Sequence, residues 1–96
     1  VIMGISTALK EKMEFANGGA KTNNFYDYKI LSAEEAPDIE VYVVETDNEL
    51  GGVGEPGVPP AAPAVANAVF HATNIRLRNL PLTAEYFLKE KRKAQL

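Results

Sequence analysis

Polar and apolar residues alternate with a period of two in the first half of the chain, which predicts β-structure. Residues 12–15 alternate, Asn17-Gly18 is a dipeptide favoured by two-residue hairpin turns, and residues 23–30 are rich in aromatic and β-branched side chains. Together they predict a β-hairpin. Residues 39–45 alternate again and predict a third, half-buried strand. One face of that strand would carry Ile39, Val41 and Val43, and the other Glu40, Tyr42 and Val44.

A helical period marks the second half of the chain and the N-terminus. Residues 1–9 predict the end of a helix, with the small residues Gly4 and Ala8 on one face suited to close packing. Residues 62–73 predict an amphipathic helix, and residues 84–94 a last helix. The apolar face of the amphipathic helix consists of Ala62, Val65, Ala66, Val69, Phe70 and Thr73.

Specific residues predict where these helices begin and end. Ser32 and Glu35 have the spacing of a capping box, but Pro37 leaves room for only one helical turn. Asn74 stands where a left-handed C-terminal cap belongs, and Thr83 can cap the last helix. The basic residues at the end of that helix suit the helix dipole.

A long segment without periodicity, from Thr46 to Pro63, separates the two halves. Acidic residues give way there to glycine, proline and alanine, and Gly51-Gly52-Val53-Gly54-Glu55-Pro56-Gly57 holds a single carboxylate. Glycine permits positive φ and the close approach of another molecule, whereas proline stiffens the chain. The segment therefore predicts a loop that presents Glu55. Long loops of this kind are either binding loops or linkers.

The composition of the chain limits the kinds of function that it can have. Ninety-six residues make at most one small domain, and a hydrophobic fraction of 46% with 24% charged residues is typical of a globular protein. A net charge of -3 favours neither nucleic acid nor an anionic membrane, and no apolar run is long enough to span a bilayer. The absence of cysteine excludes disulfides, thiolate zinc sites and iron–sulfur clusters held by this chain.

Residues 51–83 resemble the C-terminal end of the molybdenum-binding large subunit of the xanthine dehydrogenase and aldehyde oxidase family. The likeness is greatest to the branch that holds the isoquinoline 1-oxidoreductase beta chains. Residues 4–9, GISTAL, look like the family's G-L-S-x-A-L segment, and residues 24–28, NFYDY, look like its N-F-H-D-Y strand. Asn74 departs mildly from the family, which usually has glycine there. The start at Val1 without an initiator methionine suggests a C-terminal fragment, whether a split subunit or a truncated chain.

The resemblance implies a catalytic role for one residue. In the family, a glutamate in a G-x-G-E-P loop lies beside the molybdenum centre and acts as general base, and the matching position is Glu55. Gly54 and Gly57 would let the loop approach the cofactor or substrate, although turn geometry alone would also select glycine at both positions. We expect no metal ligand in this chain.

The resemblance also implies cofactors and partners outside the chain. The remainder of the large subunit would hold most of the molybdopterin cofactor, and an iron–sulfur small subunit or domain would carry the clusters. The substrate would be a small aldehyde or nitrogen heterocycle, with water as the source of oxygen. The sequence does not fix the compartment, but the resemblance favours the periplasm.

The remaining polar and aromatic residues have structural explanations. His71 is the only histidine and lies on the predicted amphipathic helix, where a structural or solvated role is expected. Asn67 could bond the preceding loop or form part of a polar helix face. Because the chain is acidic, we expect the aromatic residues Phe25, Tyr26 and Tyr28 to pack against the protein and not to stack on nucleic-acid bases. The basic residues of the last helix are expected to be solvated, and the acidic residues 34–49 to form a solvated strand edge.

We predict an α+β fold with a small antiparallel sheet and the alanine-rich helix packed on one face of it. A single fragment of a molybdopterin-binding domain would span residues 1–96. Residues 1–46 would form the helix end, hairpin and strand, residues 47–62 the catalytic loop, and residues 63–96 the helical part. Two functions stay open: a part of a molybdenum hydroxylase, inactive in isolation, or a non-catalytic interaction module whose glycine–proline loop is a linker or docking segment.

Overall fold

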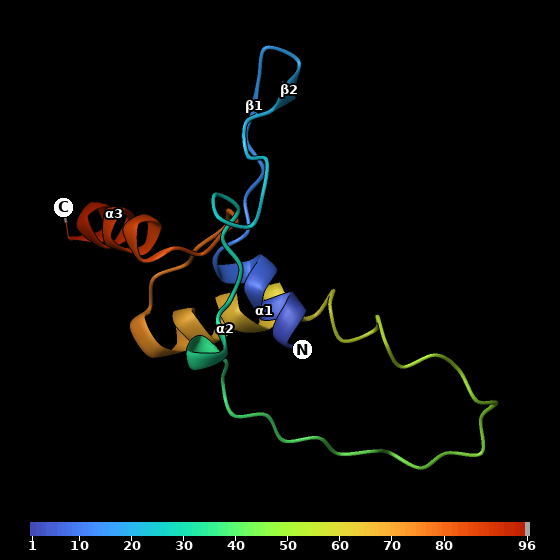
Figure 1. Cartoon of the computed structure of the whole chain (residues 1–96). Coiled ribbons are helices and arrows are strands. Elements are labelled where there is room, and N and C mark those ends of the chain that lie inside the picture. Colours follow the sequence, from blue (N-terminus) through green and yellow to red (C-terminus); the bar gives the residue numbers. More distant parts are fainter. Residues whose placement is uncertain (96) are drawn as a thin grey trace.

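The described part of the chain folds into three α-helices and one short hairpin, connected by long irregular segments. This computed structural model describes residues 1–95 (Figure 1). The elements, in order, are α1 (Ile2–Leu9), β1 (Phe15–Ala16), β2 (Gly19–Ala20), the single 3-10 turn η1 (Ala33–Glu35), α2 (Ala61–Thr73) and α3 (Ala84–Ala94). The predicted α+β class is confirmed.

Helix α1 packs directly against the start of α2. A Cβ atom added to Gly4 would lie 2.6 Å from Ala61 Cβ and 3.1 Å from the Val58 carbonyl oxygen, so only glycine allows this approach. The face predicted from Gly4 and Ala8 is confirmed, because both residues are buried. The expectation that α2 packs on the sheet is wrong. Within the described residues α2 contacts α1, and the two strands contact only each other.

Helix α1 also ties together segments that are distant in sequence. The Leu31 amide donates to Ser6 Oγ at 2.9 Å, and the Leu82 amide donates to the Ala8 carbonyl at 2.7 Å. Ala8 is completely buried, and Leu77 and Leu82 are the other buried apolar residues of the described chain. The core is therefore a small cluster around α1, and most large apolar side chains remain outside it.

The hairpin forms at the predicted turn but is shorter than expected. Asn17 and Gly18 both have positive φ, 51° and 78°, and Phe15 pairs with Ala20. Residues 23–30, predicted as the second strand, instead form a turn. The Asp27 carboxylate accepts hydrogen bonds from the amides of Asn23 and Asn24, which a β-ladder would otherwise use. These bonds lower the pKa of Asp27, with the Asn24 amide as the largest cause.

The third predicted strand, residues 39–45, pairs with no other strand of the described chain. It forms part of a wide loop that leaves the helices after η1 and returns to α2, drawn from green to yellow in Figure 1. The prediction of a third strand in the sheet is therefore wrong for this chain alone. A strand requires a backbone partner, and no described segment lies beside it to supply one.

The predicted helix ends are confirmed. At the start of η1 the Ser32 amide donates to Glu35 Oε2 at 2.9 Å, as the capping-box spacing predicts. Asn74 ends α2 in the left-handed conformation at φ 59°, and Thr83 Oγ1 accepts from the Tyr86 amide at 3.2 Å. The predicted face of α2 is largely correct. Ala62, Val65, Ala66 and Val69 are half-buried, while Phe70 and Thr73 are exposed.

None of the helices in residues 1–95 has the length and apolarity needed to cross a membrane.

Candidate functional site

Glu55 lies in a tight turn immediately before α2. The Val58 amide donates to the Glu55 carbonyl at 2.9 Å, and the Ala61 amide donates to the Val58 carbonyl at 3.1 Å. Pro56 and Gly57 occupy the two central positions of the first turn, where proline supplies a fixed φ. Two consecutive turns therefore carry the chain from Glu55 into the first residue of the helix.

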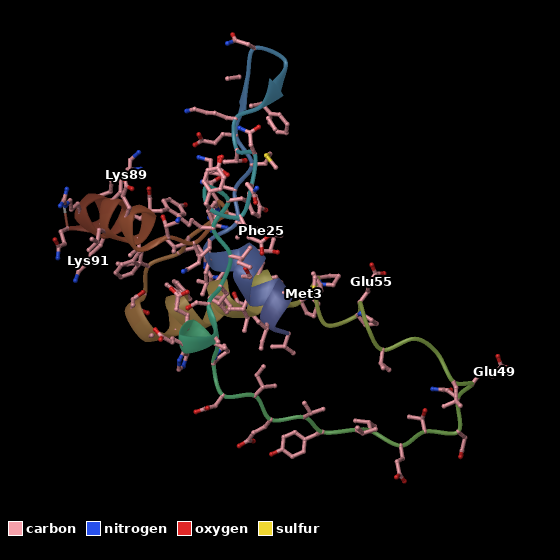
Figure 2. All side chains as sticks on the ribbon, in the orientation of Figure 1. Met3, Phe25, Glu49, Glu55, Lys89 and Lys91 are labelled. Carbon is pink, nitrogen blue, oxygen red and sulfur yellow. The ribbon has the colours of Figure 1, made fainter. Side chains whose placement is uncertain are left out.

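The downstream end of this turn is held against α1. The close approach at Gly4 involves Val58 as well as Ala61, and the added Cβ would lie 3.3 Å from Val58 Cα. A Cβ added to Gly57 would lie 3.8 Å from the Val1 nitrogen, which is ordinary contact. Residues 57 and 58 thus rest on the first turns of α1. Glu55 itself lies on the loop beyond this contact, outside the two helices, as Figure 2 shows.

The upstream side of the loop is open. A Cβ added to Gly51, Gly52 or Gly54 would meet no atom within 4 Å, and among the glycines of the described chain only Gly18 has positive φ. Neither crowding nor backbone conformation in this structure therefore requires glycine at Gly54 or Gly57. The open glycine backbone leaves room for another molecule to approach beside Glu55.

The Glu55 carboxylate is exposed and free of internal partners. Within residues 1–95 it accepts no hydrogen bond and forms no ion pair. An open hollow of about 390 Å³ adjoins it, lined by Gly52, Gly54, Glu55, Pro56 and Pro59. A carboxylate in this setting can accept a proton from a group brought into the hollow.

Residues 51–57 contain a single carboxylate, that of Glu55. No cluster of three or more histidine, aspartate or glutamate side chains that could bind a metal ion occurs among residues 1–95. The open glycines and the unpaired carboxylate do fit one wall of a site whose cofactor is held elsewhere. The arrangement offers an exposed carboxylate beside an open glycine backbone.

The other polar residues singled out in the sequence lie away from this loop. His71 is exposed on α2. Asn67 Oδ1 accepts from Arg76 Nη1 at 2.7 Å, so it bonds the segment after α2 and not the loop before it. The Arg76 guanidinium also stacks over the Phe70 ring, 4.1 Å from its centroid. The sequence does not predict this role of Arg76, because a contact with a residue nine positions earlier leaves no periodic signal.

The aromatic residues near the hairpin differ in their surroundings. Phe25 and Tyr26 are 77% and 74% exposed, whereas Tyr28 Oη donates to Glu11 Oε2 at 2.9 Å. This hydrogen bond to Glu11 raises the pKa of Tyr28. Tyr28 thereby fastens the turn of residues 23–30 to the end of α1, which is a structural contact.

Comparison with characterised proteins finds several similar sequences, of which three are described first. The beta chain of isoquinoline 1-oxidoreductase from Brevundimonas diminuta is 40% identical over 82 residues, 85% of this chain and 10% of that protein. A nicotinate dehydrogenase subunit of Pseudomonas putida is 41% identical over 86 residues, 88% of this chain and 7% of that protein. A membrane-bound aldehyde dehydrogenase of Gluconacetobacter polyoxogenes, named for pyrroloquinoline quinone, is 32% identical over 81 residues, 84% of this chain and 10% of that protein.

Further relatives carry names of molybdenum-binding subunits of xanthine dehydrogenase and aldehyde oxidoreductase, at 34% and 30% identity. The match extends over 92% and 90% of this chain. The chain spans only about a tenth of the length of the relatives that it matches. No family model matches the chain.

Proposed function

The chain belongs to the family of molybdenum-binding subunits of xanthine dehydrogenases and aldehyde oxidoreductases, and from this membership we propose that it supplies the general-base glutamate of a molybdenum hydroxylase. Residues 1–96 would be the C-terminal part of the molybdopterin-binding domain, with Glu55 as the base. The enzyme would oxidise an aldehyde or a nitrogen heterocycle, with water as the oxygen source. This chain alone would be inactive.

The observation that carries the proposal is the setting of Glu55. Its carboxylate is exposed and has no hydrogen-bond or ion-pair partner within residues 1–95. One end of its loop rests on α1, and the other end consists of glycines with open space around them. The setting suits a base completed by another part of the subunit.

The residues of this chain would perform the proton-handling part of the reaction. Covering of the Glu55 carboxylate by another part of the subunit would exclude water from it and hold it within reach of the proton it accepts. Glu55 Oε1 or Oε2 would then accept the proton of the attacking water-derived oxygen. Gly54 and Gly57 would permit the backbone to approach the cofactor or substrate. When bound, the molybdopterin cofactor would supply a redox centre that accepts two electrons from the substrate carbon.

Partners and substrate class follow from the same membership. The remainder of the molybdenum-binding subunit would hold most of the cofactor, because the described residues offer no metal-binding cluster. Iron–sulfur clusters on a partner chain or domain would pass the electrons onward. Two relatives are named for the nitrogen heterocycles isoquinoline and nicotinate, and a third for an aldehyde, which supports these two substrate classes.

The test is a matched pair of substitutions in the assembled enzyme. Glu55→Gln removes the base while keeping the size of the side chain, and Glu49→Gln makes the same change at another exposed glutamate of the same loop (Figure 2). We expect Glu55→Gln to lower kcat by about 100-fold or more, the typical contribution of a general base, with the molybdenum content unchanged. Glu49→Gln should retain wild-type kcat.

Two results would contradict the proposal. If Glu55→Gln retained full turnover, Glu55 would not be the base. If this variant lost activity together with its molybdenum, its role would be structural, as in a docking module. Metal and quinone analysis of the native enzyme gives a separate test, because one relative is named for pyrroloquinoline quinone. An enzyme that contained this quinone and no molybdenum would overturn the proposed cofactor.

A further inference from the structure

The largest unexplained feature of the chain is the exposed apolar segment of residues 39–45, called here the strand segment. Val41, Tyr42, Val43 and Val44 are 76%, 83%, 85% and 82% exposed. A run of large apolar side chains with so little cover is unusual on a free surface and marks an interaction site. The segment also has high β-propensity, because it is dominated by valine and tyrosine.

The backbone of the strand segment is as uncovered as its side chains. Within the described chain, none of its amides or carbonyls makes a backbone hydrogen bond. Figure 1 shows it outstretched and away from α1 and α2. A buried backbone must find partners, whereas this one is free to pair along either edge. The segment therefore has the features of a strand that adds to the sheet of another body.

The two faces of the strand segment differ in polarity. In a strand, Ile39, Val41 and Val43 would point to one side, and Glu40, Tyr42 and Val44 to the other. On the second side Tyr42 Oη already donates to Glu40 Oε2 at 2.8 Å, so this face carries a polar pair suited to solvent. The purely apolar first face is the one that would meet a hydrophobic core.

We propose that the strand segment adds as an edge strand to a β-sheet in the remainder of the molybdenum-binding subunit. The identity of this occupant rests on the proposed function. It is favoured because the chain covers only about a tenth of the length of its relatives, so most of such a subunit lies outside it. The chain itself offers only three buried apolar residues among those described, too small a core to cover the segment.

Strand addition would also position the base. Nine residues lie between Glu45 and Glu55, and the downstream end of the loop already rests on α1 through Val58. Pairing of the strand segment would fix the near end. The Glu55 loop would then be anchored at both ends. The loop would lose its conformational entropy once, during assembly, and would not have to be ordered again at each turnover.

The first experiment is hydrogen exchange by mass spectrometry on the assembled native enzyme and on the free full-length chain. We expect peptides covering residues 39–45 to exchange at least about tenfold more slowly in the enzyme than in the free chain. Equal exchange in the two samples would overturn the proposal. Protection that appeared in the free chain, and increased with its concentration, would also overturn it in favour of pairing between two copies.

A second experiment tests which face is buried. Val43→Asp and Val44→Asp place the same charge at two valines of nearly equal exposure in this chain, 85% and 82%. We expect Val43→Asp to reduce the yield of assembled enzyme about tenfold, and Val44→Asp to leave it within about twofold of the wild type. Equal yields of the two variants would contradict the assignment of the faces and with it the strand addition.

These measurements can refute the strand addition without refuting the proposed function, and the reverse. Hydrogen exchange does not depend on turnover, and a Glu55→Gln enzyme should show the same protection of residues 39–45 as the wild type. Protection in an enzyme without molybdenum would refute the proposed function and leave the strand addition intact. Exposed residues 39–45 in an active molybdenum enzyme would refute the strand addition alone.

Discussion

The closest contact between helices, at Gly4, gives the sharpest prediction about the stability of this chain. In Gly4→Ala the new Cβ would lie 2.6 Å from Ala61 Cβ, where ordinary contacts measure 3.4–4 Å. It would also lie 3.1 Å from the Val58 carbonyl oxygen. Both neighbours are fixed to the backbone, so no side-chain rotation can relieve the overlap. Helices α1 and α2 would have to separate by about 1 Å.

The expected change in the free energy of unfolding is the difference of two opposing terms. Overpacking typically costs about 1–3 kcal/mol, and the upper half of this range applies because two rigid neighbours are involved. Alanine in a helix is favoured over glycine by about 1 kcal/mol. We therefore expect Gly4→Ala to lower the free energy of unfolding by about 1–2 kcal/mol.

Urea denaturation of the full chain, followed by helical circular dichroism, measures this change. With a slope of about 1 kcal/mol/M for a small protein, the midpoint should fall by about 1–2 M. Gly51→Ala is the matched control, because its Cβ would meet no atom within 4 Å and its φ is not positive. This control should be unchanged or slightly stabilised through the unfolded state.

A double substitution tests whether the contact between Gly4 and Ala61 causes the destabilisation. Gly4→Ala with Ala61→Gly removes the shortest contact, so its destabilisation should be smaller than the sum of the two single effects by about 1 kcal/mol. The reasoning would be refuted if Gly4→Ala were as stable as Gly51→Ala, or if the two substitutions were simply additive. Either result would mean that α1 and α2 do not meet at this distance.

Two local features give further predictions. Asn74→Ala should destabilise α2 by about 1 kcal/mol, because alanine disfavours the left-handed conformation seen at φ 59°, while Asn74→Gly should be neutral. Thermal unfolding of the two variants measures this difference, and equal stability of the two would contradict the role of Asn74 as a cap. Hydrogen bonds from the Lys10 side chain, then from the amide and hydroxyl of Ser32, lower the pKa of Glu35 from 4.5 to about 2. A lowered acid pKa stabilises the folded state above pH 4.5, and this stabilisation is lost as pH falls from 4.5 toward 2. A carboxyl NMR titration should show the low pKa, and Lys10→Met should raise it; a titration of Glu35 at 4.5 in the unchanged chain would contradict the contact.

The features predicted correctly from the sequence are those made by residues close together in the chain. The Asn17-Gly18 turn, the Ser32–Glu35 box, the Asn74 cap and the Thr83 cap each close within four residues. Backbone preference and a single side-chain hydrogen bond decide such features, so the surrounding fold hardly affects them.

The errors in the predicted sheet have one physical origin. Residues 23–30 have strand composition, but Asp27 satisfies the nearby amides locally and makes a turn. Residues 39–45 have the right alternation, but no described segment pairs with them. Alternation indicates which face a strand would bury and does not supply the neighbouring backbone that makes it a strand.

The order of residues alone predicts the family resemblance and the helix boundaries. It also identifies Glu55 as the carboxylate of the glycine–proline loop. The packing of α2 on α1, and the way this contact holds the turn after Glu55, emerged only in three dimensions. The reason is that Gly4 and Ala8 indicate a face suited to close packing but do not identify what packs there. The partners of Gly4, Val58 and Ala61, lie more than fifty residues away.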